Sequence, residues 1–323
     1  MKKGQEKLAH QGIDGCTFTV ETNWVYTPLV QDVLLKNPQG NVFGTLKQIG
    51  IEYILFVCPP KYVRETNEIP FGVDDLPYLD DMRIEIERVL KKQFPKGYSI
   101  RLTKVEVNTT GTLVGKCECD NMFNLFCNAM LHNKDQNILY VTQSKENFID
   151  REIPGFVSRT VGNQWKLKCY NKSKQIEVEF GITRENPLIR IEFILMSRKI
   201  DKLFGKRQKL CNIFSQAGVM LLIKEYGVLM DNLIENHVKK YLTAVHKQLL
   251  EDLRQLESPT DVYCLRKQNI HDKIQMKRAL QSWYRERNMN DNSNQVLQGL
   301  NKKFGLPSHT LETIKKFHFS HRE

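Results

Sequence analysis

The chain has 323 residues, enough for two domains of ordinary size, and a hydrophobic fraction of 41% that can form a core. No stretch approaches the ~18 uncharged apolar residues that a membrane span needs, and the polar first ten residues are unlike a secretory signal, so we expect no membrane-embedded part. The formal net charge of +11 favours a polyanionic partner, with nucleic acid first and an anionic membrane surface second.

The first part of the chain mixes two kinds of periodicity. Alternation of apolar with polar residues, or a short apolar run, predicts strands, and the strand segments are 14–24, 52–57, 99–108, 136–142, 164–170, 174–181 and 188–196. Helical spacing predicts helices over 78–93 and 121–131, with a loop over 61–75. Residues 1–205 are therefore predicted to form an α+β domain around a mostly antiparallel sheet.

After residue 205 the pattern becomes helical, over 207–215, 217–226, 228–257 and 270–287. This second part, residues 206–323, has 20 Lys and Arg against 12 Asp and Glu, whereas the first 205 residues have 28 against 25. Basic residues of a helix most often form a solvated face. The alternative is a basic helical DNA-binding region.

The last two predicted helices, 295–304 and 308–318, flank a short turn and resemble a helix-turn-helix region. The helix that begins at Ser308 would enter the groove of the DNA. Phosphate contacts would come from four lysines: Lys302, Lys303, Lys315 and Lys316.

The eight cysteines lie mostly apart from one another, which is typical of free thiols in a reducing cytoplasm. Cys117, Cys119 and Cys127 form a cluster with His132 nearby. A zinc site usually has C-x2-C pairs, which this cluster lacks, so strand cysteines near the start of a helix are the alternative interpretation.

Residues 165–205 carry the most informative pattern. Tyr170 ends a predicted strand and has Lys168, Lys172 and Lys174 beside it. A later strand contains the run Arg190, Ile191 and Glu192, and an earlier strand contains Glu106 and Asn108. Taken singly, a tyrosine in a strand usually packs, lysines beside a strand are usually solvated, and Arg190 with Glu192 would form a surface ion pair of under ~1 kcal/mol.

Together these three strands resemble the rolling-circle replication initiators, namely the filamentous-phage replication protein family and the related plasmid replication initiation factors. The resemblance rests on K-x-Y-x-K around Tyr170, on R-[IF]-E at residues 190–192, and on the strand that contains Glu106 and Asn108. It extends over about residues 99–205 and is weaker over 14–60.

The resemblance implies site- and strand-specific nicking and joining of DNA through a 5′-phosphotyrosine. Tyr170 would be the nucleophile, and Lys172 and Lys174 would neutralise phosphate or lower the pKa of the tyrosine. Glu106, Asn108 and Glu192 would hold Mg²⁺ or Mn²⁺. Arg190 would contact DNA.

Two features depart from related enzymes. Many single-strand endonucleases of this mechanism hold metal with a His-x-His strand, and none of the eight histidines forms that pair. The family often has an acidic residue a few positions after the lysine, where Gln175 lies, so either Glu177 takes that role or it is an exposed strand residue.

Other functions stay open at this stage. A conjugative relaxase would nick DNA in the same way, and a non-catalytic plasmid- or phage-type origin-binding initiator or repressor would explain the charge alone. An RNA-binding protein is a third class, although the stacked-aromatic signature of RNA-binding sheets is absent. No G-x4-G-K-[ST] loop occurs, so an initiator would need a host helicase.

Overall fold

The computed structural model describes residues 9–22, 29, 31–113, 126, 155–159, 164–206, 208–238, 240–241 and 243–244. For residues 155–159 only the backbone is described. The predicted helix over 121–131, the predicted strand over 136–142 and every predicted helix beyond 244 lie wholly or almost wholly outside these ranges. None of the described helices has the length and hydropathy to cross a membrane.

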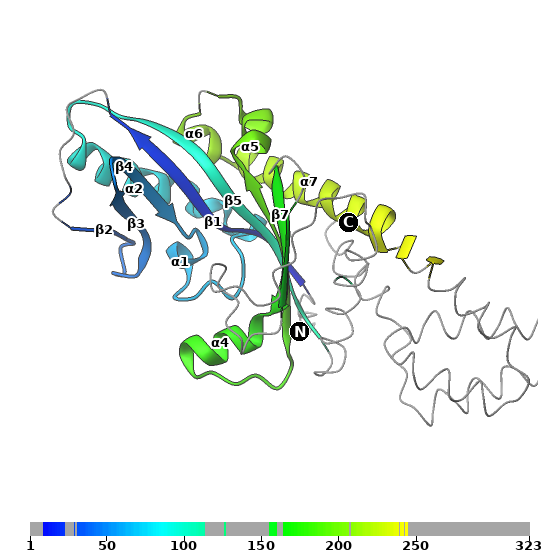
Figure 1. Cartoon of the computed structure of the whole chain (residues 1–323). Coiled ribbons are helices and arrows are strands. Elements are labelled where there is room, and N and C mark those ends of the chain that lie inside the picture. The colour runs from blue at the N-terminus through cyan, green and yellow to red at the C-terminus, as the bar shows by residue number, and fades with distance from the viewer. Residues whose placement is uncertain are drawn as a thin grey trace, which may run out of the picture. The chain divides into compact units, whose positions relative to one another are not determined.

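An eight-stranded sheet, antiparallel throughout, forms the centre of the described chain (Figure 1). Its order is β2-β3-β4-β1-β5-β8-β7-β6. The strands are β1 (Ala9–Glu21), β2 (Val33–Lys36), β3 (Val42–Ile49), β4 (Glu52–Val57), β5 (Ser99–Thr112), β6 (Gly155–Arg159), β7 (Trp165–Asn171) and β8 (Leu188–Met196). The predicted α+β class with a mostly antiparallel sheet is confirmed.

Helices connect and cover the strands. They are α1 (Pro60–Val63), a 3-10 helix η1 (Val73–Tyr78), α2 (Leu79–Gln93), α4 (Lys172–Phe180), α5 (Ser197–Phe204), α6 (Leu210–Ile213) and α7 (Gln216–Asn232), followed by a π-helical segment η2 (Leu233–Val238). Helix α6 and α7 as far as Leu229 belong to the same compact unit as the sheet. That residues 206–323 as a whole form a DNA-binding region stays a prediction.

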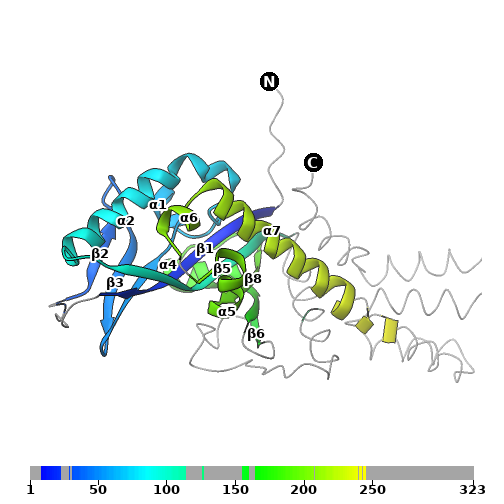
Figure 2. The same cartoon turned by 90° about the horizontal axis from the view of Figure 1, so that it is seen from above.

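One face of the sheet is the hydrophobic core. Phe18, Leu55 and Leu102 are directly opposite one another on three neighbouring strands and are fully buried. Aromatic contacts fix helices on this face: Phe94, just after α2, packs on Tyr53, and Tyr226 of α7 packs on Phe193. Figure 2 shows α2 and α7 along the same side of the sheet.

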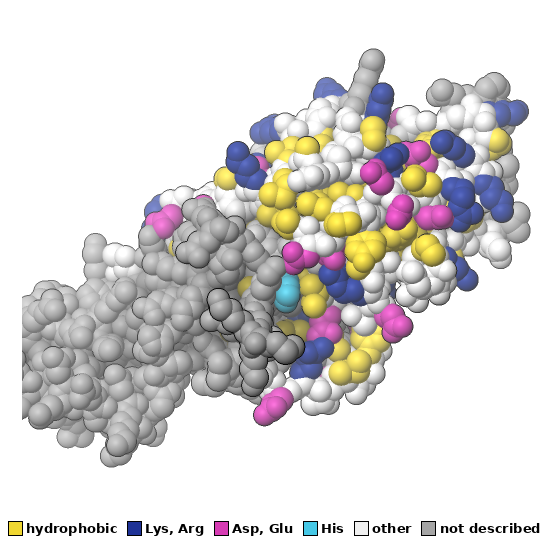
Figure 3. Space-filling model, turned by 180° about the vertical axis from the view of Figure 1, so that it is seen from behind, with side chains coloured by type: hydrophobic (Ala, Val, Ile, Leu, Met, Phe, Trp, Pro, Cys, Tyr) yellow, Lys and Arg dark blue, Asp and Glu magenta, His cyan; other side chains and the backbone are white. Residues whose placement is uncertain are grey.

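Some apolar surface remains exposed beyond this core. Large side chains that stay partly exposed include Ile84 of α2 and Met220 and Val228 of α7. Seen from behind the view of Figure 1, hydrophobic side chains gather in the middle of the molecule with charged side chains around and between them (Figure 3).

The prediction of a strand over 174–181 is wrong, because these residues belong to helix α4. The alternating run Ile176, Val178 and Phe180 suggested a strand, but only Ile176 is buried. The helix begins after Asn171, whose side chain accepts a hydrogen bond from the backbone N–H of Lys174 at 2.9 Å. It ends at Gly181, whose φ of 69° is the left-handed conformation that glycine adopts most readily.

Several further elements differ from the prediction. Strands β2, β3 and β6 and helix α5 were not predicted, and the predicted loop over 61–75 contains most of α1 and the start of η1. The short β2 and the limited alternation of β3 give little signal at sequence level.

Candidate metal and nucleophile site

The strand register brings most of the predicted site residues onto the sheet face opposite the core. Directly opposite residues of an antiparallel pair project to the same face. One cross-strand row is Asn108–Glu192–Lys168, and the next is Thr110–Arg190–Tyr170. Glu106 lies two residues before Asn108 on β5 and therefore shares this face.

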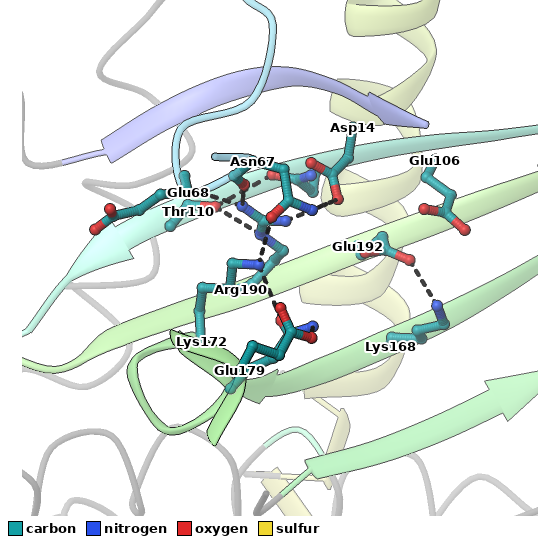
Figure 4. A network of polar contacts seen from close by, with 12 residues as sticks. Asp14, Asn67, Glu68, Glu106, Thr110, Lys168, Lys172, Glu179, Arg190 and Glu192 are labelled. Carbon is teal, nitrogen blue, oxygen red and sulfur yellow. Dashed lines mark hydrogen bonds and ion pairs between the residues drawn. The ribbon is translucent and has the colours of Figure 1, made fainter. Parts of the chain in front are cut away.

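A β-bulge adds a residue that the sequence analysis did not single out. Ile13 is opposite Val107 and Gly15 is opposite Glu106, so Asp14 is an extra residue in β1. Its carboxylate is directed towards Arg190, with Glu106 and Glu192 beside it (Figure 4). One oxygen from each carboxylate lies within 4.8 Å of the other two, and we call Asp14, Glu106 and Glu192 the carboxylate cluster.

Arg190 connects the carboxylate cluster to Thr110 and to the segment that contains Asn67 and Glu68. The side chain is fully buried and donates to Thr110 Oγ1 at 2.9 Å and to Asp14 Oδ2 at 2.8 Å. It also donates to the carbonyl oxygens of Asn67 and Glu68 at 2.5 and 2.8 Å. Arg190 was predicted to bind DNA, but in this structure its guanidinium is committed to protein acceptors.

The segment that supplies these carbonyls is anchored to β1 by a short antiparallel bridge. Ile13 and Phe71 exchange two backbone hydrogen bonds of 2.9 Å. A Cβ on Gly12 would lie 2.1 Å from the carbonyl oxygen of Phe71, so only glycine permits this approach. The sequence thereby places Asn67 and Glu68 above the site.

The cluster is held among cations. Lys168 Nζ lies 3.0 Å from Glu192 Oε1, and Lys104 forms an ion pair with Glu106. Burial alone would raise the pKa of Glu106, but the neighbouring Lys168 and Lys104 ammonium groups bring it below its usual value. Burial raises the pKa of Glu192, although Lys168 opposes this effect.

Two observations suit a cation ligated by oxygens. Asp14 Oδ1 is buried and has no hydrogen-bond partner among the described residues, although a buried carboxylate oxygen normally has one. Asn108 Nδ2 is also buried and also has no hydrogen-bond partner among the described residues. If the amide oxygen and nitrogen of Asn108 were exchanged, an oxygen would take the place of Nδ2. Three carboxylates and one amide form the hard donor set that Mg²⁺ or Mn²⁺ prefers.

Tyr170 is connected to the cluster through Arg190. Arg190 is directly opposite Tyr170 in the sheet and interacts electrostatically with its hydroxyl, and the same guanidinium donates to Asp14. The tyrosine is only 9% exposed. Burial raises the pKa of Tyr170 well above its usual value, and Arg190 acts in the opposite direction.

The two lysines predicted to assist Tyr170 lie in different places. Lys172, at the start of α4, is fully buried and donates to Asn67 Oδ1 at 3.1 Å and Gln175 Oε1 at 2.9 Å. Burial, followed by the charge of Arg190, lowers the pKa of Lys172 to about 8. Lys174 forms a part-exposed pair with Glu177 on α4, so neither of these two residues belongs to the cluster.

Several predicted features lie outside the described residues. These are the four lysines of the helix-turn-helix prediction (Lys302, Lys303, Lys315 and Lys316) and the cluster of Cys117, Cys119, Cys127 and His132. Among the described residues, cysteines 16, 58, 169 and 211 form no disulfide.

Comparison with known proteins gives a limited result. No protein-family profile and no curated protein sequence matches the chain. A solved structure of a rolling circle replication initiator protein from Geobacillus stearothermophilus is similar at 10% identity, over 71% of this chain and 85% of that one, with a TM-score of 0.32. A likeness at this level does not establish a common fold.

Proposed function

We propose that this chain initiates rolling-circle DNA replication by nicking and rejoining one DNA strand, with Tyr170 as the nucleophile. One observation carries the proposal: a tyrosine hydroxyl shares a sheet face, and an arginine contact, with three clustered carboxylates. That combination provides a nucleophile that can later leave and a place for a divalent cation.

In the nicking step, Tyr170 Oη would form a bond to the scissile phosphorus while the bond from phosphorus to the 3′ oxygen breaks. The products are a 5′-phosphotyrosine and a free 3′ hydroxyl, whose proton balances the one that the phenol loses. The reverse attack by a 3′ hydroxyl joins the strand and restores the tyrosine.

Asp14, Glu106 and Glu192, with the Asn108 amide, would hold Mg²⁺ or Mn²⁺, and the bound cation would supply polarisation of the scissile phosphate. Arg190 would orient the Tyr170 hydroxyl and stabilise the phenolate. Lys168 would neutralise the negative charge of Glu192 through their ion pair as long as no cation is bound.

The proposal requires an opening of the site. Tyr170 is 9% exposed. The neighbouring Arg190 donates hydrogen bonds to the backbone carbonyl oxygens of Asn67 and Glu68. A DNA phosphate reaches the hydroxyl only if Tyr170 or the groups that bury it move. Movement would also remove part of the burial that raises the pKa of Tyr170.

One observation favours a non-catalytic origin-binding protein instead. Three cations, Lys104, Lys168 and Arg190, already pair with the three carboxylates. Such a balanced network can be purely structural. Under this alternative the chain binds origin DNA but neither cuts it nor needs a divalent cation.

A nicking assay decides between these functions. Supercoiled DNA carrying the sequence that flanks the gene would be incubated with the wild type, with Tyr170→Phe and with Tyr226→Phe, with and without Mn²⁺ or Mg²⁺. Tyr226 is a matched control, because it is also buried but donates to the Ile191 carbonyl on the core side. Open circles that need the cation and disappear only in Tyr170→Phe support the proposal, whereas DNA binding without nicking in all three supports the alternative.

A further inference from the structure

An open groove crosses four strands beside the carboxylate cluster. It has a volume of about 250 Å³ and runs over β3, β4, β1 and β5, strands that lie next to one another in Figure 1. Helix α1 contributes Lys61 at one side, and the β5 side is formed by Lys104 and Glu106. Because Glu106 belongs to the cluster, the groove ends at the candidate site.

The floor of the groove contains an exposed aromatic ring. Phe56 is 39% exposed although β4 lies between two paired strands. It is directly opposite Thr45 on β3 and Thr17 on β1, and Thr17 is opposite Lys104 on β5. This cross-strand row therefore places the phenyl ring of Phe56 between two threonine side chains, and it ends at the lysine Lys104.

A small residue keeps the floor open at the end of the groove next to the carboxylate cluster. A Cβ on Gly15 would lie 3.0 Å from Glu106 Oε2. A volume of about 250 Å³ is just below the ~300–1,000 Å³ of sites for whole small-molecule ligands. The groove thus has room for one planar group over Phe56 rather than for a bound cofactor.

We infer that this groove binds one unpaired base of single-stranded DNA, with the base stacked on Phe56 and its phosphates near Lys61 and Lys104. The inference rests on the proposed function and extends it, because it assigns the path by which the strand approaches Glu106. Aromatic rings that stack on bases and lysines that neutralise phosphates are the two elements of single-strand recognition. A duplex keeps its bases stacked on each other and cannot use the ring.

The test measures binding without chemistry. A fluorescein-labelled dT20 strand and a labelled duplex of the same length would be titrated with full-length protein in EDTA, so that no divalent cation is available. The variants are Phe56→Ala, Phe56→Trp and, as a control, Tyr78→Ala, an aromatic residue that is 45% exposed at the start of α2. The inference predicts that Phe56→Ala weakens dT20 binding roughly 5- to 150-fold, the range of one stacked base.

Phe56→Trp is expected to keep the affinity for dT20, and all variants are expected to bind the duplex as the wild type does. Lys61→Gln with Lys104→Gln should reduce the salt dependence of dT20 binding, since each lost phosphate contact lowers the slope by roughly 0.7. Equal dT20 affinity of the wild type and Phe56→Ala overturns the inference and leaves nicking by Tyr170 untouched. If Tyr170→Phe abolishes nicking but Phe56→Ala does not change dT20 affinity, the proposed nicking function stands and the stacking of a base on Phe56 is wrong.

Discussion

Tyr170 and Arg190 are directly opposite each other on β7 and β8, and the charge of the arginine opposes the burial that raises the pKa of the tyrosine. The same guanidinium pairs with Asp14, which lies on the far side of β5 from β8. Arg190 therefore links the candidate nucleophile to the carboxylate cluster across four neighbouring strands, from β7 to β1. Single substitutions can therefore test the tyrosine and the carboxylate cluster separately.

Removing Arg190 should destabilise the protein strongly. Arg190→Met leaves the buried Asp14 carboxylate without its partner, a change that typically costs about 3–5 kcal/mol. Arg190→Lys should recover little, because an ammonium cannot reproduce the fork that reaches Thr110, Asp14 and the two carbonyls. Urea unfolding measures the free energy of unfolding of each variant.

The control for this prediction is Arg101→Met. Arg101 pairs with Asp201 at 2.7 Å but is 45% exposed, so its loss should change the free energy of unfolding by less than about 1 kcal/mol. Similar losses for Arg101→Met and Arg190→Met would show that the buried network contributes no more than a surface pair.

Asp14→Asn should weaken divalent-cation binding. A Mn²⁺ titration followed by calorimetry is expected to show at least a tenfold loss of affinity, because even outer partners of metal ligands are usually worth 10- to 100-fold. Asp32→Asn is the matched control, since Asp32 pairs with Lys47 on the exposed surface. A wild type with no Mn²⁺ binding at millimolar concentration would contradict the assignment of the cluster as a metal site.

Glu106, Asn108, Glu192 and Tyr170, which the sequence pattern indicated as site residues, lie on one face of the sheet, and each belongs to a strand whose alternation is clear. Asp14 was missed, since its place depends on a bulge that alternation does not reveal. The available signal was an acidic residue between Ile13 and Gly15 in an otherwise β-forming run. The burial of Arg190 was equally hidden, because it depends on a segment more than 100 residues away in the sequence.

The error over α4 has a different physical origin. The run from Lys174 to Gly181 alternates as a strand would, but helix capping outweighs this pattern. Asn171 as the N-cap and Gly181 as the terminating glycine were both readable in the sequence. The consequence is functional, because the helix turns Lys174 outward to Glu177 and keeps Lys172 in the interior.

The buried Lys172 predicts a specific pH dependence of stability. The pKa of Lys172 falls from 10.5 to about 8 on folding, so the unfolded chain binds more protons between these pH values. Stability of the wild type should therefore rise with pH across this window relative to Lys172→Met, by up to roughly 3 kcal/mol at 1.36 kcal/mol per pH unit. Below pH about 8 the difference between the two proteins should be constant.

Paired urea titrations from pH 7 to about 10 would measure this difference, and other titrating groups cancel because both proteins share them. Lys174→Met, at a part-exposed lysine of the same helix, is the control for the loss of a lysine side chain. A flat difference for Lys172→Met would mean that Lys172 is solvated rather than buried.

The central claim is the covalent bond between Tyr170 and DNA, and peptide mapping of the adduct tests it most directly. After reaction with labelled origin DNA and digestion with trypsin, cleavage after Lys168 and Lys172 releases a four-residue peptide in which Tyr170 is the only tyrosine. We predict that this peptide carries the 5′ nucleotide and that the adduct is absent in Tyr170→Phe. Nicked DNA with its 5′ end on another peptide, or with no protein attached, would contradict the assignment.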